Sequence, residues 1–275
     1  MNQEAAQPAA APVILRIEGV TRTFCGVHGS SATQALSPID FSVMENDFVT
    51  ILGPSGCGKS TLLRIIAGLD HPSGGQVFLD GQPVVGPGPE RGMVFQSYTL
   101  FPWLTVEENI RFGLRERGMG AAQQKERSDF FIAKVGLRGF EHNYPKQLSG
   151  GMQQRTAIAR ALANDPKMLL LDEPFGALDN QTRVLMQELL LGIWEQAQKT
   201  VLFVTHDIDE AIFMASRVAV FSARPGCIKS EIEVNFPHPR HYTLKTSPEF
   251  MQLKARLTEE IRAETLAAAS SAPAR

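Results

Sequence analysis

The chain has 275 residues, of which 43% are hydrophobic and 20% are charged, so it can bury the core of one large domain or of a core with an inserted lobe. Lys and Arg total 27 against 29 Asp and Glu, a formal net charge of −2, which excludes an overall basic field for binding nucleic acid or an anionic membrane. Three widely separated cysteines, Cys25, Cys57 and Cys227, fit neither a disulfide framework nor a zinc spacing and indicate a reducing cytoplasm.

Both ends of the chain are predicted to be loose tails. Residues 1–12 are rich in Ala, Gln and Pro, and residues 267–275 are rich in Ala and Ser. The start lacks the basic head and apolar stretch of a signal peptide, and no segment approaches the ~18 continuous apolar residues of a membrane span. We therefore expect neither a secretion signal nor a transmembrane segment.

Three short apolar runs predict buried parallel strands, because they lack the alternation of a half-exposed strand and are separated by amphipathic helical patterns. They are Phe48–Leu52, Met168–Leu171 and Val201–Val204. The alternation of strands and helices predicts an α/β fold.

A phosphate-binding loop follows the first of these strands and precedes an apolar helix over Leu62–Leu69. It fits the pattern G-x-x-x-x-G-K-[ST] and comprises Gly53, Pro54, Ser55, Gly56, Cys57, Gly58, Lys59, Ser60 and Thr61. Its backbone N–H groups and the helix N-terminus would hold phosphates, with Lys59 on the β- and γ-phosphates and Ser60 on Mg²⁺. The alternative is a glycine-rich turn with an exposed lysine, which would not require a strand, a loop and a helix in this order. Cys57 is interpreted as a small residue that fits the loop.

Residues 97–165 carry helical patterns without a convincing strand, which predicts a helical lobe inserted in the core. The patterns cover Thr105–Arg117, Gln123–Val135 and Met152–Ala163, and Asn164-Asp165-Pro166 is predicted to close the last helix, with Asn in the left-handed cap. The chain is thus divided into a core in two segments, a helical lobe and a C-terminal extension, over residues 13–96 with 166–230, 97–165 and 231–275.

The last helix of this lobe opens with Leu148-Ser149-Gly150-Gly151-Met152-Gln153-Gln154-Arg155. Two glycines and a serine at a helix N-terminus form an anion cradle, although Ser-Gly-Gly is also a good helix entry. Since the chain already has a phosphate loop, a second cradle makes sense if it serves the ATP of another subunit.

Two carboxylates end the Met168–Leu171 strand. Strand ends of a parallel sheet gather at the ligand crevice, so Asp172 can reach the Mg²⁺ shell and Glu173 can polarise an attacking water. An acidic turn after a strand is also common as simple punctuation. His206 follows the Val201–Val204 strand at the same edge, where a histidine is either a hydrogen-bonded structural residue or part of the site.

Over roughly residues 13–230 the order and spacing of these motifs resemble the ABC ATPases. The segment from Leu148 to Arg155 resembles the signature motif. Gln96 matches the Q-loop glutamine, and Asp172-Glu173 matches the Walker B pair. Ala177-Leu178-Asp179 matches the D-loop, and His206 matches the switch histidine. The resemblance implies a RecA-like P-loop NTPase core with an inserted helical subdomain, and ATP and Mg²⁺ as cofactors.

The same resemblance implies a head-to-tail homodimer in which Ser149, Gly150 and Gly151 of one subunit close on the ATP of the other, with Asp179 also at the nucleotide. It implies Glu173, His206, Lys59 and Gln96 as catalytic residues and Ser60, Gln96 and Asp172 at Mg²⁺. Phe24 looks like the aromatic residue that stacks on adenine, although a phenylalanine before a strand is also a common core residue. Met152 departs from the glutamine common at its position in the signature.

Three kinds of ABC protein compete: an importer subunit, a soluble translation or repair ATPase, and an exporter subunit. The segment from Ser97 to Ile110 resembles the region that docks a permease in importers, and exposed Leu100, Phe101 and Trp103 would suit an apolar helix, unless they form the core of the lobe. The soluble types usually carry two cassettes or a long coiled coil, which this chain lacks.

The C-terminal motifs resemble the nitrate/sulfonate/taurine family of importer ATPases. These motifs are Ser222-Ala223-Arg224-Pro225-Gly226-Cys227-Ile228, Phe236-Pro237-His238-Pro239-Arg240 and Ser247-Pro248-Glu249-Phe250. The implied partners are a membrane-spanning permease and an extracytoplasmic substrate-binding protein, with no nucleic acid, and the implied place is the cytoplasmic face of the inner membrane. The transported molecule is not readable from this chain.

Overall fold

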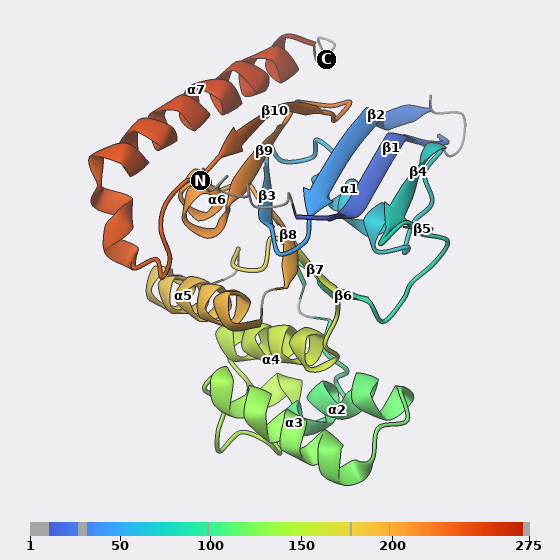
Figure 1. Cartoon of the computed structure of the whole chain (residues 1–275), viewed down its shortest axis with the longest axis vertical. Helices are drawn as coiled ribbons and strands as arrows, with labels where there is room; N and C mark the ends of the chain where they lie inside the picture. The colour runs from blue at the N-terminus through green and yellow to red at the C-terminus, as the bar shows by residue number, and fades with distance from the viewer. Residues whose placement is uncertain (1–10, 27–31, 98, 177, 198, 272–275) are drawn as a thin grey trace, which may run out of the picture.

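The computed structural model describes residues 11–26, 32–97, 99–176, 178–197 and 199–271. Two sheets and a set of helices make up this part of the chain (Figure 1). The larger sheet has the strand order β10-β9-β3-β8-β7-β6. Its strands are β3 (Phe48–Leu52), β6 (Arg91–Val94), β7 (Met168–Asp172), β8 (Thr200–Thr205), β9 (Arg217–Phe221) and β10 (Ile228–Glu233).

The central strands of this sheet are parallel, as predicted from the three apolar runs. β3 pairs in parallel with β8 and β9, and β7 pairs in parallel with β8 and β6, whereas β10 is antiparallel to β9. All five side chains of β3 are buried because both faces of the sheet are covered. Phe48 and Leu52 belong to one core cluster, and Val49 and Ile51 to another on the opposite face.

The second sheet is antiparallel and was not anticipated from the sequence. Its order is β2-β1-β4-β5, with β1 (Val13–Phe24), β2 (Thr33–Met44), β4 (Gly74–Leu79) and β5 (Gln82–Pro83). β1 alternates between buried Leu15 and Ile17 and exposed Arg16 and Glu18, so it lacks the continuous apolar run that marked the parallel strands.

The helices are α1 (Lys59–Ile66), α2 (Val106–Glu116), α3 (Ala121–Lys134), α4 (Gly150–Ala163), α5 (Asn180–Ala197), α6 (Ile208–Met214) and α7 (Pro248–Ser271), with 3₁₀ turns η1 (Pro145–Gln147) and η2 (Tyr242–Thr246). Figure 1 shows α2, α3 and α4 gathered at one end of the molecule, away from the antiparallel sheet. Thr105 and Glu108 form a capping box at the start of α2, which fixes where this lobe begins.

Two predictions about where helices end are corrected by the structure. Asn164 is the C-cap of α4 but keeps a right-handed conformation, and the following Asp165 takes the left-handed one with φ 52°. Asn164 is instead held by a bond from its side-chain nitrogen to Arg160 O, so the chain turns one residue later. Near the C-terminus of the chain, α7 continues to Ser271, whereas a loose tail was expected from residue 267.

The C-terminal segment packs on α6 rather than standing apart. Phe250 and Leu257 of α7 are fully buried in the same cluster as Phe213 of α6. Arg240 is 6% exposed and donates to Ile212 O, Phe213 O and Ala215 O at the C-terminal end of α6. Burial lowers the pKa of this guanidinium to about 10. These bonds satisfy carbonyls that a helix end leaves without partners.

Candidate nucleotide site

The predicted phosphate loop lies between β3 and α1, and two of its glycines, Gly53 and Gly58, are required by close packing. Gly58 has φ 109°, and a Cβ there would lie 2.7 Å from Leu36 Cδ2. A Cβ on Gly53 would lie 2.8 Å from Phe221 Cβ. Any other residue at these two positions would force its neighbours to shift. The two glycines therefore allow the loop to pack closely against β2 and the end of β9.

Lys59, the first residue of α1, folds back over this loop. Its Nζ donates to Gly53 O and Pro54 O, both at 2.7 Å, and the residue is only 4% exposed. An ammonium group held at the start of a helix adds its charge to the helix dipole and to the loop N–H groups, which together favour an anion. Cys57 is buried beside it, and burial raises the pKa of its thiol, so it is inert packing as predicted.

Ser60 and Asp172 meet across the cleft although they are far apart in the sequence. Ser60 Oγ donates to Asp172 Oδ1 at 2.8 Å, and Asp172 is 2% exposed at the end of β7. Burial raises the pKa of the Asp172 carboxyl, while the bond from Ser60 acts in the opposite direction. A hydroxyl and a carboxylate oxygen at this spacing are hard donors of the kind that Mg²⁺ takes, so the pair fits that ion.

Glu173 is the meeting point of the other predicted groups. Its Oε2 accepts from Gln96 Nε2 at 3.1 Å and lies 3.2 Å from His206 Nδ1. The residue has φ 45°, and its N–H donates to Val204 O at 2.9 Å. A left-handed conformation is uncommon for glutamate and is held here by the neighbouring strand, as is often found at functional sites. The structure thus joins three strand ends at one carboxylate.

One cleft of about 380 Å³ contains most of these groups. Its lining is Ala35, Ser55, Gly56, Gly58, Lys59, Ser60, Thr61, Gln96, Glu173 and Arg224. Arg224 and Ala35 were not assigned to the site from the sequence. Arg224 follows β9, a strand whose end lies at the same edge as those of β3, β7 and β8, so extending the strand-end argument to this fourth strand would have found it.

The signature residues do not line this cleft. Ser149 caps α4 by accepting from Met152 N at 3.3 Å, and Gly150 and Gly151 form the first turn. A Cβ on Gly151 would lie 3.1 Å from Thr182 Cγ2, so the start of α4 packs closely on the start of α5. Asp179 caps that helix start, accepting from Gln181 N and Thr182 N, whereas Ala177 lies outside the described residues.

Phe24 also lies outside the cleft lining and outside both core clusters. It is the last residue of β1, it is 39% exposed, and the Arg22 guanidinium lies 4.6 Å from its ring centroid. The alternative interpretation of Phe24 as a core residue is therefore wrong, and the adenine-stacking interpretation stays a prediction.

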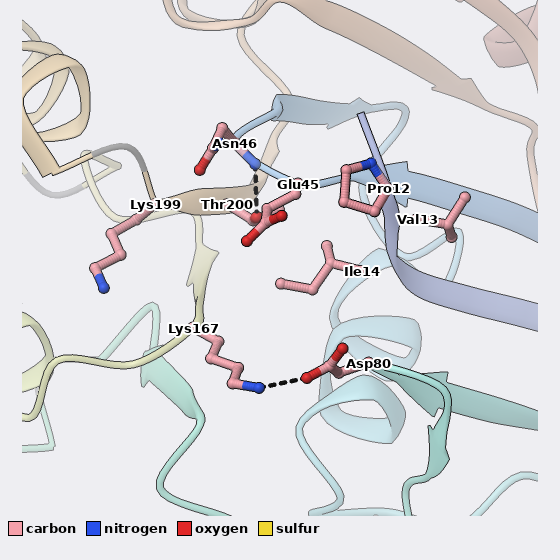
Figure 2. Close-up of a pocket in the computed structure, with 9 residues that line it drawn as sticks. All are labelled: Pro12, Val13, Ile14, Glu45, Asn46, Asp80, Lys167, Lys199 and Thr200. Carbon is pink, nitrogen blue, oxygen red and sulfur yellow. Dashed lines mark hydrogen bonds and ion pairs between the residues drawn. The ribbon is translucent and has the colours of Figure 1, made fainter. Parts of the chain in front are cut away.

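A separate hollow of about 170 Å³ lies at the opposite ends of the parallel strands (Figure 2). Its lysines already have acidic partners, since Lys167 pairs with Asp80 and Lys199 with Asp165. Thr200 Oγ1 accepts from Asn46 N across the hollow. This hollow contains none of the predicted site residues and is set apart from the phosphate loop by the length of the sheet.

Residues 36–176, over half of the chain, match the ABC transporter family. The chain belongs to the ABC transporter family, in which it is an ATP-binding and ATP-hydrolysing cassette.

Its relatives include proteins named for import. It is 51% identical over 92% of the chain to an uncharacterized ABC transporter ATP-binding protein of Methanocaldococcus jannaschii, of which 93% is covered. It is 47% identical to the nitrate import ATP-binding protein NrtD of Synechocystis sp. (90% of the chain, 98% of the relative) and 49% identical to the aliphatic sulfonates import ATP-binding protein SsuB of Bacillus cereus (89% and 94%).

Solved structures support the same fold. The dimeric post-hydrolysis state of the ATP-binding cassette MJ0796 with ADP and Pi covers 82% of this chain and 100% of that one, with a TM-score of 0.73 and 34% identity. A second dimeric structure of MJ0796 gives a TM-score of 0.74 at 35% identity. The prediction of a RecA-like core with an inserted helical subdomain is confirmed.

Proposed function

We propose that the chain is the ATPase subunit of an importer and that it hydrolyses MgATP at the cleft formed by the ends of β3, β7 and β8. The observation that carries this proposal is the convergence of Gln96 and His206 on Glu173, beside the pair formed by Ser60 and Asp172. These groups supply a carboxylate for the attacking water, a polar environment that orients it, and hard ligands for a cation.

The residues act in distinct roles in this proposal. The loop N–H groups and Lys59 bind the β- and γ-phosphates, and Ser60 and Asp172 hold Mg²⁺, with Gln96 nearby. When bound, Mg²⁺ neutralises charge on the phosphate oxygens. Glu173 accepts a hydrogen bond from the attacking water, and His206 orients that carboxylate and donates towards the γ-phosphate.

The signature residues are proposed to act on the nucleotide of a second copy. Ser149, Gly150 and Gly151 present a helix N-terminus that does not line the cleft of their own chain. The structures of MJ0796 are dimeric, and one is bound to ADP and Pi, which supports a paired cassette. Two copies arranged head to tail would each complete the site of the other, with Asp179 at the junction.

A groove between the core and the helical lobe supports permease docking. It encloses about 700 Å³ and includes Phe95, Phe101 and Phe112 among its lining, with Arg160 over the Phe101 ring at 5.4 Å. Trp103 beside it is 69% exposed. Of the three apolar residues predicted to be exposed, Leu100 packs against the core instead and Phe101 is half-buried.

A nitrate- or sulfonate-like substrate is proposed because of the names of two relatives, NrtD and SsuB. The partners would be a membrane permease and an extracytoplasmic substrate-binding protein, with the chain held at the cytoplasmic face of the membrane. Among the described residues, no helix is long and apolar enough to cross a membrane.

Co-purification tests this assignment. A tagged Glu173→Gln chain, expressed in its native host and purified with MgATP from gently solubilised membranes, should bring with it a multi-spanning permease identified by mass spectrometry. A Trp103→Ala version should recover less of the permease, whereas Phe130→Ala, on the exposed face of α3, is the matched control and should retain it. Recovery only from the soluble fraction, with ribosomal or repair proteins, would contradict the importer assignment.

A further inference from the structure

The turn that carries His206 is fixed on both sides by one hydroxyl group. Thr205, the last residue of β8, is 2% exposed; its Oγ1 donates to Glu210 Oε2 at 2.7 Å and accepts from Asp207 N at 3.0 Å. Asp207 Oδ1 in turn accepts from Glu210 N at 3.1 Å. The residues before and after His206 are therefore tied to each other and to Glu210, while the His206 side chain stays half exposed and faces Glu173.

The second oxygen of Glu210 extends this arrangement to α5. Glu210 Oε1 accepts from Gln187 Nε2 at 3.3 Å and lies 3.6 Å from Arg183 Nε. Arg183 Nη2 donates to Leu178 O at 3.1 Å, in the segment just before α5. Gln187 Oε1 accepts from Lys245 Nζ of η2 at 2.9 Å. One carboxylate thus connects the His206 turn, the start of α5 and the C-terminal segment.

Glu210 has no direct route to nucleotide. It is 5% exposed and does not line the cleft, and a buried carboxylate is costly unless it is paired. Burial raises its pKa, and this is opposed by the bond from Thr205 and by Arg183 and His206, while Asp207 adds to it. The carboxyl group is therefore held in place by specific hydrogen-bond partners.

We infer that Glu210 is a positioning residue for hydrolysis, because its bond to Thr205 holds the turn that places His206 against Glu173. This inference rests on the role of His206 in the proposed function. A shift of about 1 Å in a positioned group can reduce a rate by roughly 10²-fold. Since Glu210 does not reach the cleft, losing its bond affects the chemical step and leaves nucleotide binding intact.

The test compares kcat with the ATP dissociation constant in the full chain. Glu210→Ala should lower kcat by about 10- to 100-fold and leave ATP affinity within about twofold. Glu210→Gln keeps an acceptor for Thr205 Oγ1 and should retain kcat within about threefold. Asp209→Asn is the matched control on the same helix; Asp209 pairs with Lys254 rather than with Thr205, so kcat should not change.

A second pair of variants covers the case in which Glu210→Ala does not fold. Thr205→Val has nearly the same shape but no hydroxyl and should show the same fall in kcat with intact ATP affinity, whereas Thr205→Ser should retain kcat. Wild-type kcat in a folded Glu210→Ala or Thr205→Val chain would overturn the inference, as would an equal loss in ATP affinity. His206→Ala separates a failure of this inference from a failure of the proposed function. An unchanged kcat in that variant would contradict the proposed role of His206 itself.

Discussion

At the scale of single residues, the site is a set of strand-end groups that converge on one carboxylate. The sequence was sufficient to predict that the phosphate loop, Asp172, Glu173 and His206 lie at one edge of the sheet, because each lies at the end of a recognisable buried strand. It was not sufficient for Arg224, because only three of the strand ends were used. The contacts of Glu210 could not be predicted from the sequence either. Its hydrogen bond with Thr205 depends on how α6 is oriented relative to β8.

Glu173→Gln should abolish hydrolysis while preserving ATP binding. The amide has nearly the same shape and can still bond Gln96, but it cannot serve as a base for the water, so kcat should fall by about 10² to 10⁴-fold. Steady-state phosphate release and ATP titration measure the two effects. The control is Glu259→Gln on the exposed face of α7. Retained hydrolysis in the Glu173 variant would remove this residue from its proposed role.

The raised pKa of Glu210 predicts a pH-dependent effect on stability. Folding raises the pKa of the Glu210 carboxyl and therefore disfavours its ionised form. The contribution of this group to the free energy of unfolding is largest below its pKa in the unfolded chain, and it is lost as pH rises through its pKa in the folded chain. Glu210→Gln removes this loss. The Tm of the variant minus that of wild type should therefore be larger at pH 8 than at pH 5. For a chain of this size, a change of about 1 kcal/mol in the free energy of unfolding shifts the Tm by roughly 2–4 °C.

Thermal unfolding without nucleotide measures this difference, with Glu259→Gln as a control that should show no trend. A difference that grows as pH falls would show that the ionised Glu210 is favoured by folding, contrary to the direction of its pKa.

At the scale of elements, apolar runs identified the parallel strands, whereas the antiparallel sheet was missed. β1 shows a period of two with charged residues on its exposed face. It is stabilised by pairing with β2, the next strand in the chain, and with β4, which follows only after β3 and α1. The turn after α4 was placed one residue early, because both Asn164 and Asp165 can take the left-handed conformation and packing decides between them.

The helical lobe gives the prediction at this scale. Trp103→Ala removes an exposed aromatic beside the apolar groove and should weaken association with permease-containing membranes by about 10-fold or more, because buried aromatic anchors carry much of an interface's energy. ATP affinity should be unchanged. Membrane flotation with and without the permease measures the association. Phe130→Ala, on the exposed face of α3, is the matched control, and an equal loss in both variants would count against docking at Trp103.

At the scale of the whole molecule, the cleft and the start of α4 are the two halves of the composite site proposed to form between two copies of the chain. The cleft with Lys59 is the half proposed to hold phosphates, and the start of α4, proposed as a second anion cradle, does not line that cleft. The described part of the C-terminal segment is bonded to α6 through Arg240 and to α5 through Lys245, so it packs on the core. In the proposed head-to-tail pair, each chain would supply the cleft for one ATP and the start of α4 for the other.

Mixing two defective variants tests whether ATP is shared between two copies of the chain. In a Glu173→Gln background, Lys59→Ala lacks the phosphate-loop half of the site and Ser149→Arg lacks the signature half, so neither should form an ATP-dependent dimer alone. A mixture contains one intact composite site per mixed pair, so we expect MgATP-dependent dimers in sedimentation or size-exclusion measurements. A mixture that stays monomeric, while the Glu173→Gln chain itself dimerises, would contradict the sharing of ATP between two copies.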